Sequence, residues 1–276
     1  MLKLYHHSRT ESRAHHADPP AYSLGSVGHA GGVGRPEAEV RFAAGLRVFL
    51  APRHRGGRVR VACDGTSTLG HVVESLGVPL PEVGDLAVNG RPAAPSFRLS
   101  GGDVADVGAI RRPQPSPSPR FLLDVHLGTL ARRLRLVGVD AAYGNDLDDD
   151  TLIARANAGR RVLLTQDRGL LCRRKLWRGA YVRGARPDEQ LADVLDRFAP
   201  PLAPWTRCTA CNGQLSPVSK ADVEQLLPPG TRRTYHSFAR CAACGRIYWR
   251  GAHSKRLEPI VESALRAVAV VRASGR

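Results

Sequence analysis

The sequence RFLLDVHLGTLARRLRLVGVDAAYGNDLDDDTLIARANAGRRVLLTQD, residues 120–167, decides the fold because short apolar strands alternate along it with helices. Leu127, Leu130 and Leu134 recur with the period of one helical face, and Gly138 follows as the helix stop. A short basic helix, the strand GAYVRG and the helix PDEQLADVLDRF continue the alternation. This order predicts an α/β fold with a parallel sheet and helices on its faces.

Acidic residues follow the strands of this predicted sheet. Asp124 ends the first strand and Asp167 ends the third, and ligands of parallel sheets bind beyond the carboxyl ends of the strands. Gathered carboxylates repel one another unless they are solvated or share a cation, and oxygen ligands suit Mg²⁺ or Mn²⁺. Such ions activate water and stabilise the leaving oxygen of a phosphodiester. Further acids follow the second strand: Asp146, Asp148, Asp149 and Asp150.

Each of these acids has an alternative structural role. Asp148, Asp149 and Asp150 open a predicted helix, where acidic residues favour the positive end of the helix dipole. Asp124 has the alternative role of a surface turn residue.

Two C-x-x-C pairs in the C-terminal third predict a metal site. Cys208 and Cys211 form the first pair and Cys241 and Cys244 the second, which suits a closed structural Zn²⁺ site. A pair of redox dithiols and an iron–sulfur cluster are the alternatives. The long spacing between the pairs predicts an inserted hairpin or helix around ADVEQLL.

The C-terminal third interleaves basic and aromatic side chains, a pattern that can hold phosphates and stack unpaired bases. Packing within the small ribbon is the alternative role of Trp249. The final segment predicts a short amphipathic helix that packs on the ribbon. The candidate nucleic-acid-binding residues are Arg168, Arg232, Arg233, Arg246, Trp249 and His253.

A separate small domain precedes this region. EVRFAAGLRVFL predicts two short strands around Gly45, STLGHVVESLG predicts a helix, and DLAVNG and GGDVADVGAI predict further strands. With AVNGRPA and LSGGDVADVGAI, residues 38–112 resemble ubiquitin-like β-grasp domains of the sulfur-carrier type. The chain continues into Arg111 and Arg112 rather than ending in Gly-Gly, so we expect a binding or structural module, and the binding role implies a protein partner.

Composition sets the remaining limits. The formal net charge of +16 fits a nucleic-acid partner, although the arginine-rich, lysine-poor bias is also what a GC-rich genome produces. We expect no membrane span, no secretory signal and no disulfide scaffold, and therefore a cytoplasmic protein. The predicted organisation is a disordered tail (1–37), the β-grasp domain (38–112), a Pro/Ser linker (113–119), the α/β domain (120–199), a zinc ribbon (204–257), and a C-terminal helix with a basic tail (258–276).

FLLDVHLGTLARRLRLVGVD, DDDTLIARANAGRRVLLTQDRGL and the two cysteine motifs resemble the PIN-like ribonuclease family called the Mut-seven C-terminal domain, over residues 120–257. The resemblance implies that Asp124 and Asp167 are catalytic metal ligands. It matches Asp149 to the acidic position that opens the second helix, with Asp150 as the competing match. PIN nucleases typically carry a fourth acid near the next strand, where YVRG has none.

The leading hypothesis is a ribonuclease dependent on Mg²⁺ or Mn²⁺, with a structural Zn²⁺ in a ribbon that assists RNA binding. The alternative is a catalytically degenerate RNA-binding adaptor on the same fold. Phosphatase chemistry with an aspartyl nucleophile needs a second acid at position 126, and that residue is His126.

Overall fold

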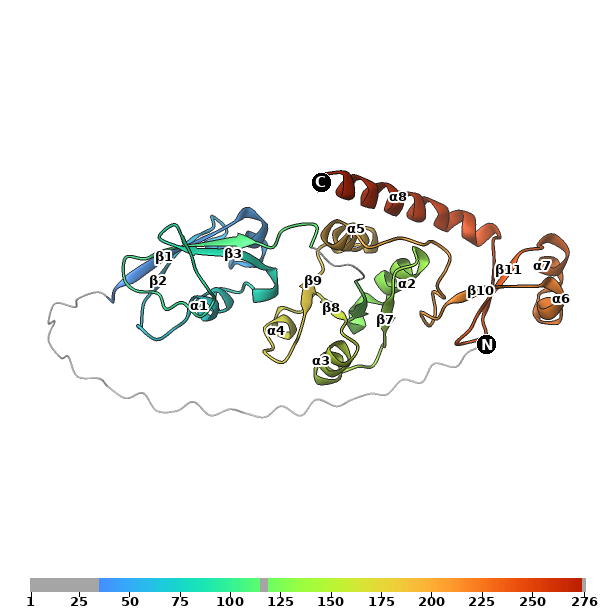
Figure 1. The fold of residues 1–276 in the computed structure, drawn as a ribbon, viewed down its shortest axis with the longest axis horizontal. Helices are drawn as coiled ribbons and strands as arrows, with labels where there is room; N and C mark the ends of the chain where they lie inside the picture. Colours follow the sequence, from blue (N-terminus) through green and yellow to red (C-terminus); the bar gives the residue numbers. More distant parts are fainter. Residues whose placement is uncertain (1–34, 115–118, 275–276) are drawn as a thin grey trace, which may run out of the picture. The chain divides into compact units, whose positions relative to one another are not determined.

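The computed structural model describes residues 35–114 and 119–274 (Figure 1). Residues 1–34 of the expected tail lie outside the described residues, and strand β1 already begins at Glu37. No helix in the described ranges is long and apolar enough to cross a membrane.

The N-terminal domain is a β-grasp fold, built on a sheet of order β2-β1-β5-β3-β4. β1 runs parallel to β5, and the other neighbouring strands are antiparallel. The Thr68 side chain caps helix α1 by accepting the His71 N–H. The elements are β1 (Glu37–Phe42), β2 (Arg58–Ala62), α1 (Leu69–Ser75), β3 (Val83–Val88), β4 (Arg91–Pro92), β5 (Val104–Ala109), and 3₁₀ helices at Ala44–Phe49, Pro52–His54 and Leu80–Glu82.

The prediction of a second strand after Gly45 was wrong. The segment AGLRVF forms the 3₁₀ helix Ala44–Phe49 instead. Leu46 and Phe49 lie three residues apart and therefore on the same side of a helix with three residues per turn. Both are buried in the β-grasp core, which a strand of alternating faces would not allow.

The α/β domain contains a parallel sheet of order β7-β6-β8-β9. This arrangement confirms the fold class expected from the sequence. The elements are β6 (Phe121–Leu123), a 3₁₀ turn (Val125–Leu127), α2 (Gly128–Leu136), β7 (Ala141–Tyr143), α3 (Asp149–Ala158), β8 (Val162–Thr165), α4 (Arg168–Leu171), β9 (Gly179–Tyr181) and α5 (Pro187–Phe198).

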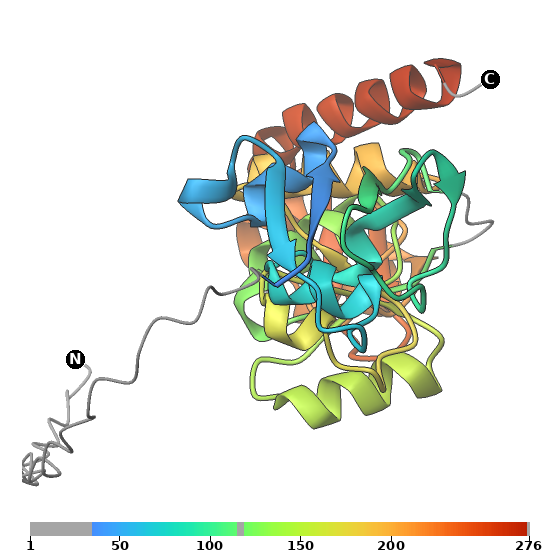
Figure 2. The same ribbon diagram turned by 90° about the vertical axis from the view of Figure 1, so that its left-hand side faces the viewer.

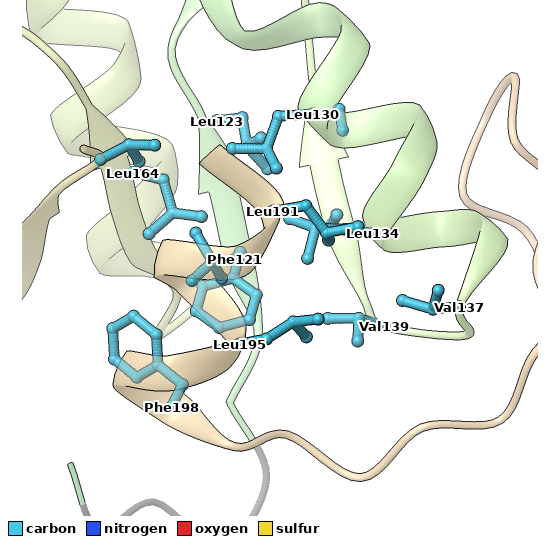
Figure 3. Close-up of a cluster of buried hydrophobic side chains, with 14 of the residues drawn as sticks. Phe121, Leu123, Leu130, Leu134, Val137, Val139, Leu164, Leu191, Leu195 and Phe198 are labelled. Atoms are coloured by element: carbon cyan, nitrogen blue, oxygen red, sulfur yellow. The ribbon is translucent and has the colours of Figure 1, made fainter. Parts of the chain in front are cut away.

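The two faces of this sheet bury separate cores. Phe121 and Leu123 pack with α2 and α5 on one face (Figure 3), whereas Leu122 packs with α3 and α4 on the other. Because successive residues of a strand point to opposite faces, the run FLL serves both cores at once. Helices therefore cover both faces of the sheet, and a ligand can approach it at the ends of its strands.

The C-terminal third forms a three-stranded antiparallel ribbon of order β10-β11-β12, followed by one long helix. Short helices occupy the insertion between the cysteine pairs, as expected. The elements are β10 (Leu215–Val218), α6 (Lys220–Val223), a 3₁₀ turn (Glu224–Leu226), α7 (Pro229–Thr234), β11 (Phe238–Cys241), β12 (Ile247–Trp249) and α8 (Ala252–Ser274).

Helix α8 differs from the expected short helix on the ribbon. It starts at Ala252, within the range assigned to the ribbon, and lies alongside α5 (Figures 1 and 2). Val261, Ala264 and Val268 are buried in the core of the α/β domain. Their spacing places them on one helical face, and burial of that face explains why the helix packs there.

The β-grasp and α/β domains are joined by a buried ion pair. Glu82 and Arg197 are 0% and 1% exposed, and the Arg197 guanidinium donates to the Glu82 carboxylate. Glu82 also accepts the Tyr181 N–H at 2.8 Å, and Arg197 donates to the Gln114 side chain and the Pro81 carbonyl. Most of the polar atoms of the pair therefore have hydrogen-bond partners. Such partners are needed to offset the free-energy cost of removing the two charges from water.

We expect Glu82→Ala to lower the free energy of unfolding by about 3–5 kcal/mol, because it leaves the Arg197 charge buried without its counter-ion. Chemical denaturation measures this change. The matched control is Glu39→Ala, which breaks a solvent-accessible pair with Arg41 and should leave the free energy of unfolding nearly unchanged. Equal effects of the two substitutions would contradict a buried interdomain pair.

Candidate active site and metal centre

Asp124 and Asp167 follow the neighbouring strands β6 and β8 at the carboxyl edge of the parallel sheet, and Thr165 bonds to the side chain of Asp124 and to the backbone of Asp167. Thr165, the last residue of β8, donates its hydroxyl to Asp124 Oδ2 at 2.6 Å and accepts the Asp167 N–H at 2.9 Å. The pairing of Leu123 with Leu164 sets this arrangement, because it places the residues that follow both strands side by side. Asp124 N–H also donates to the Leu164 carbonyl.

Both carboxylates are fixed by backbone donors as well. Asp124 is 7% exposed and accepts the Val125 N–H at Oδ1, 2.6 Å away. Asp167 is exposed and caps α4, accepting the N–H groups of Gly169 and Leu170. Asp124 is therefore held rigidly at the base of the edge, and Asp167 lies at its solvent side.

The acids after β7 open helix α3. Asp148 is the N-cap and accepts the Thr151 N–H, a hydrogen bond that lowers the pKa of Asp148. Asp149 and Asp150 occupy the first turn, and Asp150 pairs with Arg173 at 2.6 Å. Asp148 therefore has the structural role of opening the helix, which was the alternative expected from the sequence. The Asp150 carboxylate is engaged in its ion pair with Arg173.

The predicted acids do not form a closed set of metal ligands. In the described parts of the chain, the four cysteines alone form a group of three or more potential ligands whose atoms lie within 4.8 Å of one another. Thr165 is a residue that the sequence reasoning missed. The signal available in the sequence was a hydroxyl residue at the end of the apolar run VLL. The structure shows that this residue is fully buried.

The nucleic-acid-binding candidates lie in different surroundings. Arg168 is turned toward the β-grasp domain, where its guanidinium donates to the Phe49 carbonyl at 2.7 Å and lies over the Phe49 ring. This contact links Arg168 to the β-grasp domain, and its expected RNA contact stays a prediction. Arg232 is half-buried on α7, Arg233, Arg246 and Trp249 are exposed, and the side chain of His253 lies outside what the structure describes.

The cysteine pairs converge at the tip of the C-terminal ribbon. Cys208 Sγ lies 3.7 Å from Cys244 Sγ, and Cys211 Sγ lies 3.4 Å from Cys241 Sγ. Four thiolates about 2.3 Å from a tetrahedral zinc ion would be separated by about 3.8 Å. The donor set and its spacing thus fit a metal ion of this kind, and the site can hold zinc.

Local hydrogen bonds favour the thiolate form of one ligand. Burial acts to raise the pKa of Cys208, but hydrogen bonds from the Tyr248 hydroxyl and from backbone N–H groups outweigh it and lower the pKa to about 6. The first knuckle, the turn that carries Cys208 and Cys211, packs on the α/β domain. The buried Arg135 of that domain donates to the carbonyls of Thr209 and Ala210 in this turn. Asn212 adds hydrogen bonds to Ala141 and Asp140.

Comparison with known families identifies this combination. The profile described as the Mut7-C RNAse domain matches residues 119–261, more than half of the chain. The chain belongs to the Mut7-C RNAse domain family. A second profile, described as the Mut7-C ubiquitin, matches residues 35–114 and precedes the Mut7-C domain here. Both resemblances seen in the sequence are therefore confirmed.

One solved structure and the curated proteins complete the comparison. The Mut7-C chain is similar to small archaeal modifier protein 1 of H. volcanii at 22% identity over 26% of its own length and 95% of that chain, with a TM-score of 0.22. No curated protein matches the chain significantly. Membership in the Mut7-C family indicates a nuclease-like function for this α/β domain.

Proposed function

We propose that this Mut7-C protein is a metal-dependent ribonuclease that hydrolyses RNA phosphodiester bonds at the carboxyl edge of the sheet β7-β6-β8-β9. The observation that supports the proposal is the placement of Asp124 and Asp167 after the neighbouring strands β6 and β8, where the Thr165 hydroxyl bonds to the Asp124 carboxylate and to the backbone N–H of Asp167. Asp149, in the first turn of α3, is the third acid of the proposed site.

The donor set fits Mg²⁺ or Mn²⁺, because these ions prefer oxygen ligands and Mg²⁺ retains several waters while binding one or two carboxylates. A bound ion of this type would supply an activated water and charge stabilisation at the leaving oxygen. Asp124 and Asp167 would hold it, with Asp149 as an additional ligand. Thr165 positions Asp124 and leaves both of its oxygens a further acceptor direction.

The C-terminal ribbon would assist by binding the RNA strand. It bears the exposed Arg233, Arg246 and Trp249, and we assign its metal site to structural Zn²⁺. For the β-grasp domain we propose a protein partner on its exposed surface, where Val48 and Phe97 are 53% and 40% exposed.

The adaptor function is the second candidate, favoured by the spacing of the acids. No group of three carboxylates within the described residues comes within 4.8 Å, and the segment YVRG at the end of β9 contains no acid. An adaptor would bind RNA through the ribbon and leave it intact.

The test is cleavage of end-labelled single-stranded RNA by the full chain. We expect cleavage with added Mn²⁺ or Mg²⁺ and none in the metal-depleted protein, because the proposed carboxylates alone supply no activated water. Zinc content is measured in the same samples, so that loss of the cysteine-bound ion is not mistaken for loss of the catalytic ion. RNA that is bound but never cut with either metal would reject the nuclease in favour of the adaptor.

A further inference from the structure

A cavity of about 650 Å³ lies where the C-terminal ribbon meets the segment that joins it to the α/β domain. Trp205 contributes from that segment, Phe238, Tyr248 and Trp249 from β11 and β12, and Leu257 from α8. Its volume is in the range of pockets that hold small organic ligands. The cavity includes none of the carboxylates of the proposed active site, so it is a separate feature.

The backbone of Trp205 is strained. Its φ of 66° lies in the left-handed region, which bulky side chains rarely adopt. The residue is held there by a hydrogen bond from its N–H to the Leu136 carbonyl at 3.0 Å, and the Arg250 guanidinium lies over its ring at 5.5 Å. Strain of this kind persists only where the surroundings enforce it, and it concentrates at ligand sites.

The segment that carries Trp205 runs close to the end of α2. Gly138 follows α2 with φ of 86°, and a Cβ at this position would lie 2.0 Å from the Ala203 carbonyl oxygen. The glycine thus lets the connecting segment run directly against the end of α2, where Ala203 N–H donates to the Val137 carbonyl. Trp205 is thereby placed at the wall of the cavity.

The surroundings of the cavity are basic. Residues 200–276 contain 12 Lys and Arg residues against four Asp and Glu residues. Arg250 lines the cavity, and a second cavity of about 410 Å³ next to it is lined by Arg132 and Arg246 and shares Thr209. No acidic side chain is among the described residues that line either cavity. The occupant that fits is therefore planar and apolar with anionic groups attached.

We infer that this cavity binds an unpaired nucleobase of single-stranded RNA, with Arg250 and Arg246 contacting the adjacent phosphates. The choice of RNA rests on the proposed function. Every base has a π face, so stacking on tryptophan and tyrosine holds a strand without selecting its sequence. The cavity would thus anchor RNA at a distance from the carboxylates.

The test compares the binding of two labelled decamers at one fixed salt concentration. One is oligouridylate, and the other is an abasic ribose-phosphate oligomer of equal charge. The full chain carries Asp124→Asn to prevent cleavage, and fluorescence anisotropy gives each Kd. We expect oligouridylate to bind about 5- to 150-fold more tightly, the range for stacking of one base. Trp205→Gly and Trp249→Ala should remove this preference, and Trp249→Phe should retain it.

The variants separate loss of the ring from loss of the fold. Glycine tolerates the left-handed backbone of position 205, so Trp205→Gly removes the ring without adding strain. Trp177→Ala is the matched control, since Trp177 is 56% exposed and does not line the cavity. Zinc content and thermal unfolding of each variant show whether the ribbon is intact.

Three results would overturn the inference. They are equal affinity for the two decamers, no binding of either decamer, and a preference for oligouridylate that survives in the Trp205→Gly/Trp249→Ala double variant. Its failure is distinguishable from failure of the nuclease. A chain that cuts RNA with metal but shows no base preference rejects only the base-binding cavity. One that shows the preference but never cuts RNA rejects only the proposed catalysis.

Discussion

Substitution of Asp124 by Asn is expected to slow RNA cleavage by about 10³-fold, because loss of several kcal/mol of charge stabilisation slows a reaction tenfold for each 1.4 kcal/mol or so. The substitution removes the negative charge at the most buried acid of the proposed site and keeps the shape of the side chain. Single-turnover cleavage of end-labelled RNA, with saturating Mn²⁺, measures the loss.

The hydrogen bonds around Asp124 allow this variant to fold. An asparagine oxygen can accept the Val125 N–H, and its amide can donate to the Thr165 oxygen, which continues to accept the Asp167 N–H. The Thr165 hydroxyl proton then loses its partner, at a cost of about 1–3 kcal/mol. Thermal unfolding should therefore show a modest loss of stability and one cooperative fold.

Asp85→Asn is the matched control, since Asp85 is an exposed acid of the β-grasp domain paired with Arg111. Its cleavage rate should equal that of the unaltered chain. If Asp124→Asn cut RNA as fast as the control, the carboxyl edge would not be the catalytic site, whatever the metal requirement.

Local sequence was sufficient for the elements of the α/β domain. Helix α5 has Pro187 at its first position and buries Leu191, Val194 and Leu195 on one face, a pattern visible in PDEQLADVLDRF. The strand FLL is fully buried, as expected of a central parallel strand. Because parallel strands bring their carboxyl ends to one edge, the placement of Asp124 and Asp167 after neighbouring strands followed from the same reasoning, whereas their role as metal ligands stays a prediction.

Contacts between distant segments could not be predicted in this way. Arg168 was expected from the sequence to bind RNA, and nothing local indicated that its guanidinium reaches Phe49, 119 residues earlier. The partner of Glu82 is likewise 115 residues away. The contacts of these charged groups depend on how two domains dock, and no local period or motif predicts that.

The length and partner of α8 were missed for a related reason. Its apolar residues have helical spacing, which predicted a helix, but a helical face alone does not identify the surface that covers it. Helix α8 packs on the α/β domain rather than on the ribbon because the α/β domain has the larger hydrophobic core. The buried residues of the ribbon core are Val223, Leu227 and Phe238, whereas the core that α8 joins is much larger.

The small ribbon core makes a second large effect predictable. Replacing Cys208 by Ser should remove bound zinc and unfold the ribbon, because structural zinc contributes about 10–16 kcal/mol in small metal domains. Burial of three apolar side chains contributes only about 1.5–3 kcal/mol each and cannot compensate for that loss. Zinc content and amide hydrogen exchange across residues 207–249 measure the change.

Cys172→Ser is the control, since Cys172 is a free cysteine outside the four-cysteine cluster, and it should retain zinc and the exchange protection of the ribbon. A zinc-free Cys208→Ser protein with a fully protected ribbon would contradict a structural metal site.

Loss of the metal should also reach the α/β domain through Arg135. This guanidinium is 3% exposed and donates to the carbonyls of Thr209 and Ala210 in the first knuckle. When the segment that carries Cys208 and Cys211 unfolds, Arg135 Nη1 loses both of these acceptors while Nε keeps its bond to the Ala141 carbonyl, at a cost of about 1–3 kcal/mol. We therefore expect the α/β domain of Cys208→Ser to remain folded, because its core is separate, and to unfold at a lower temperature than that of Cys172→Ser.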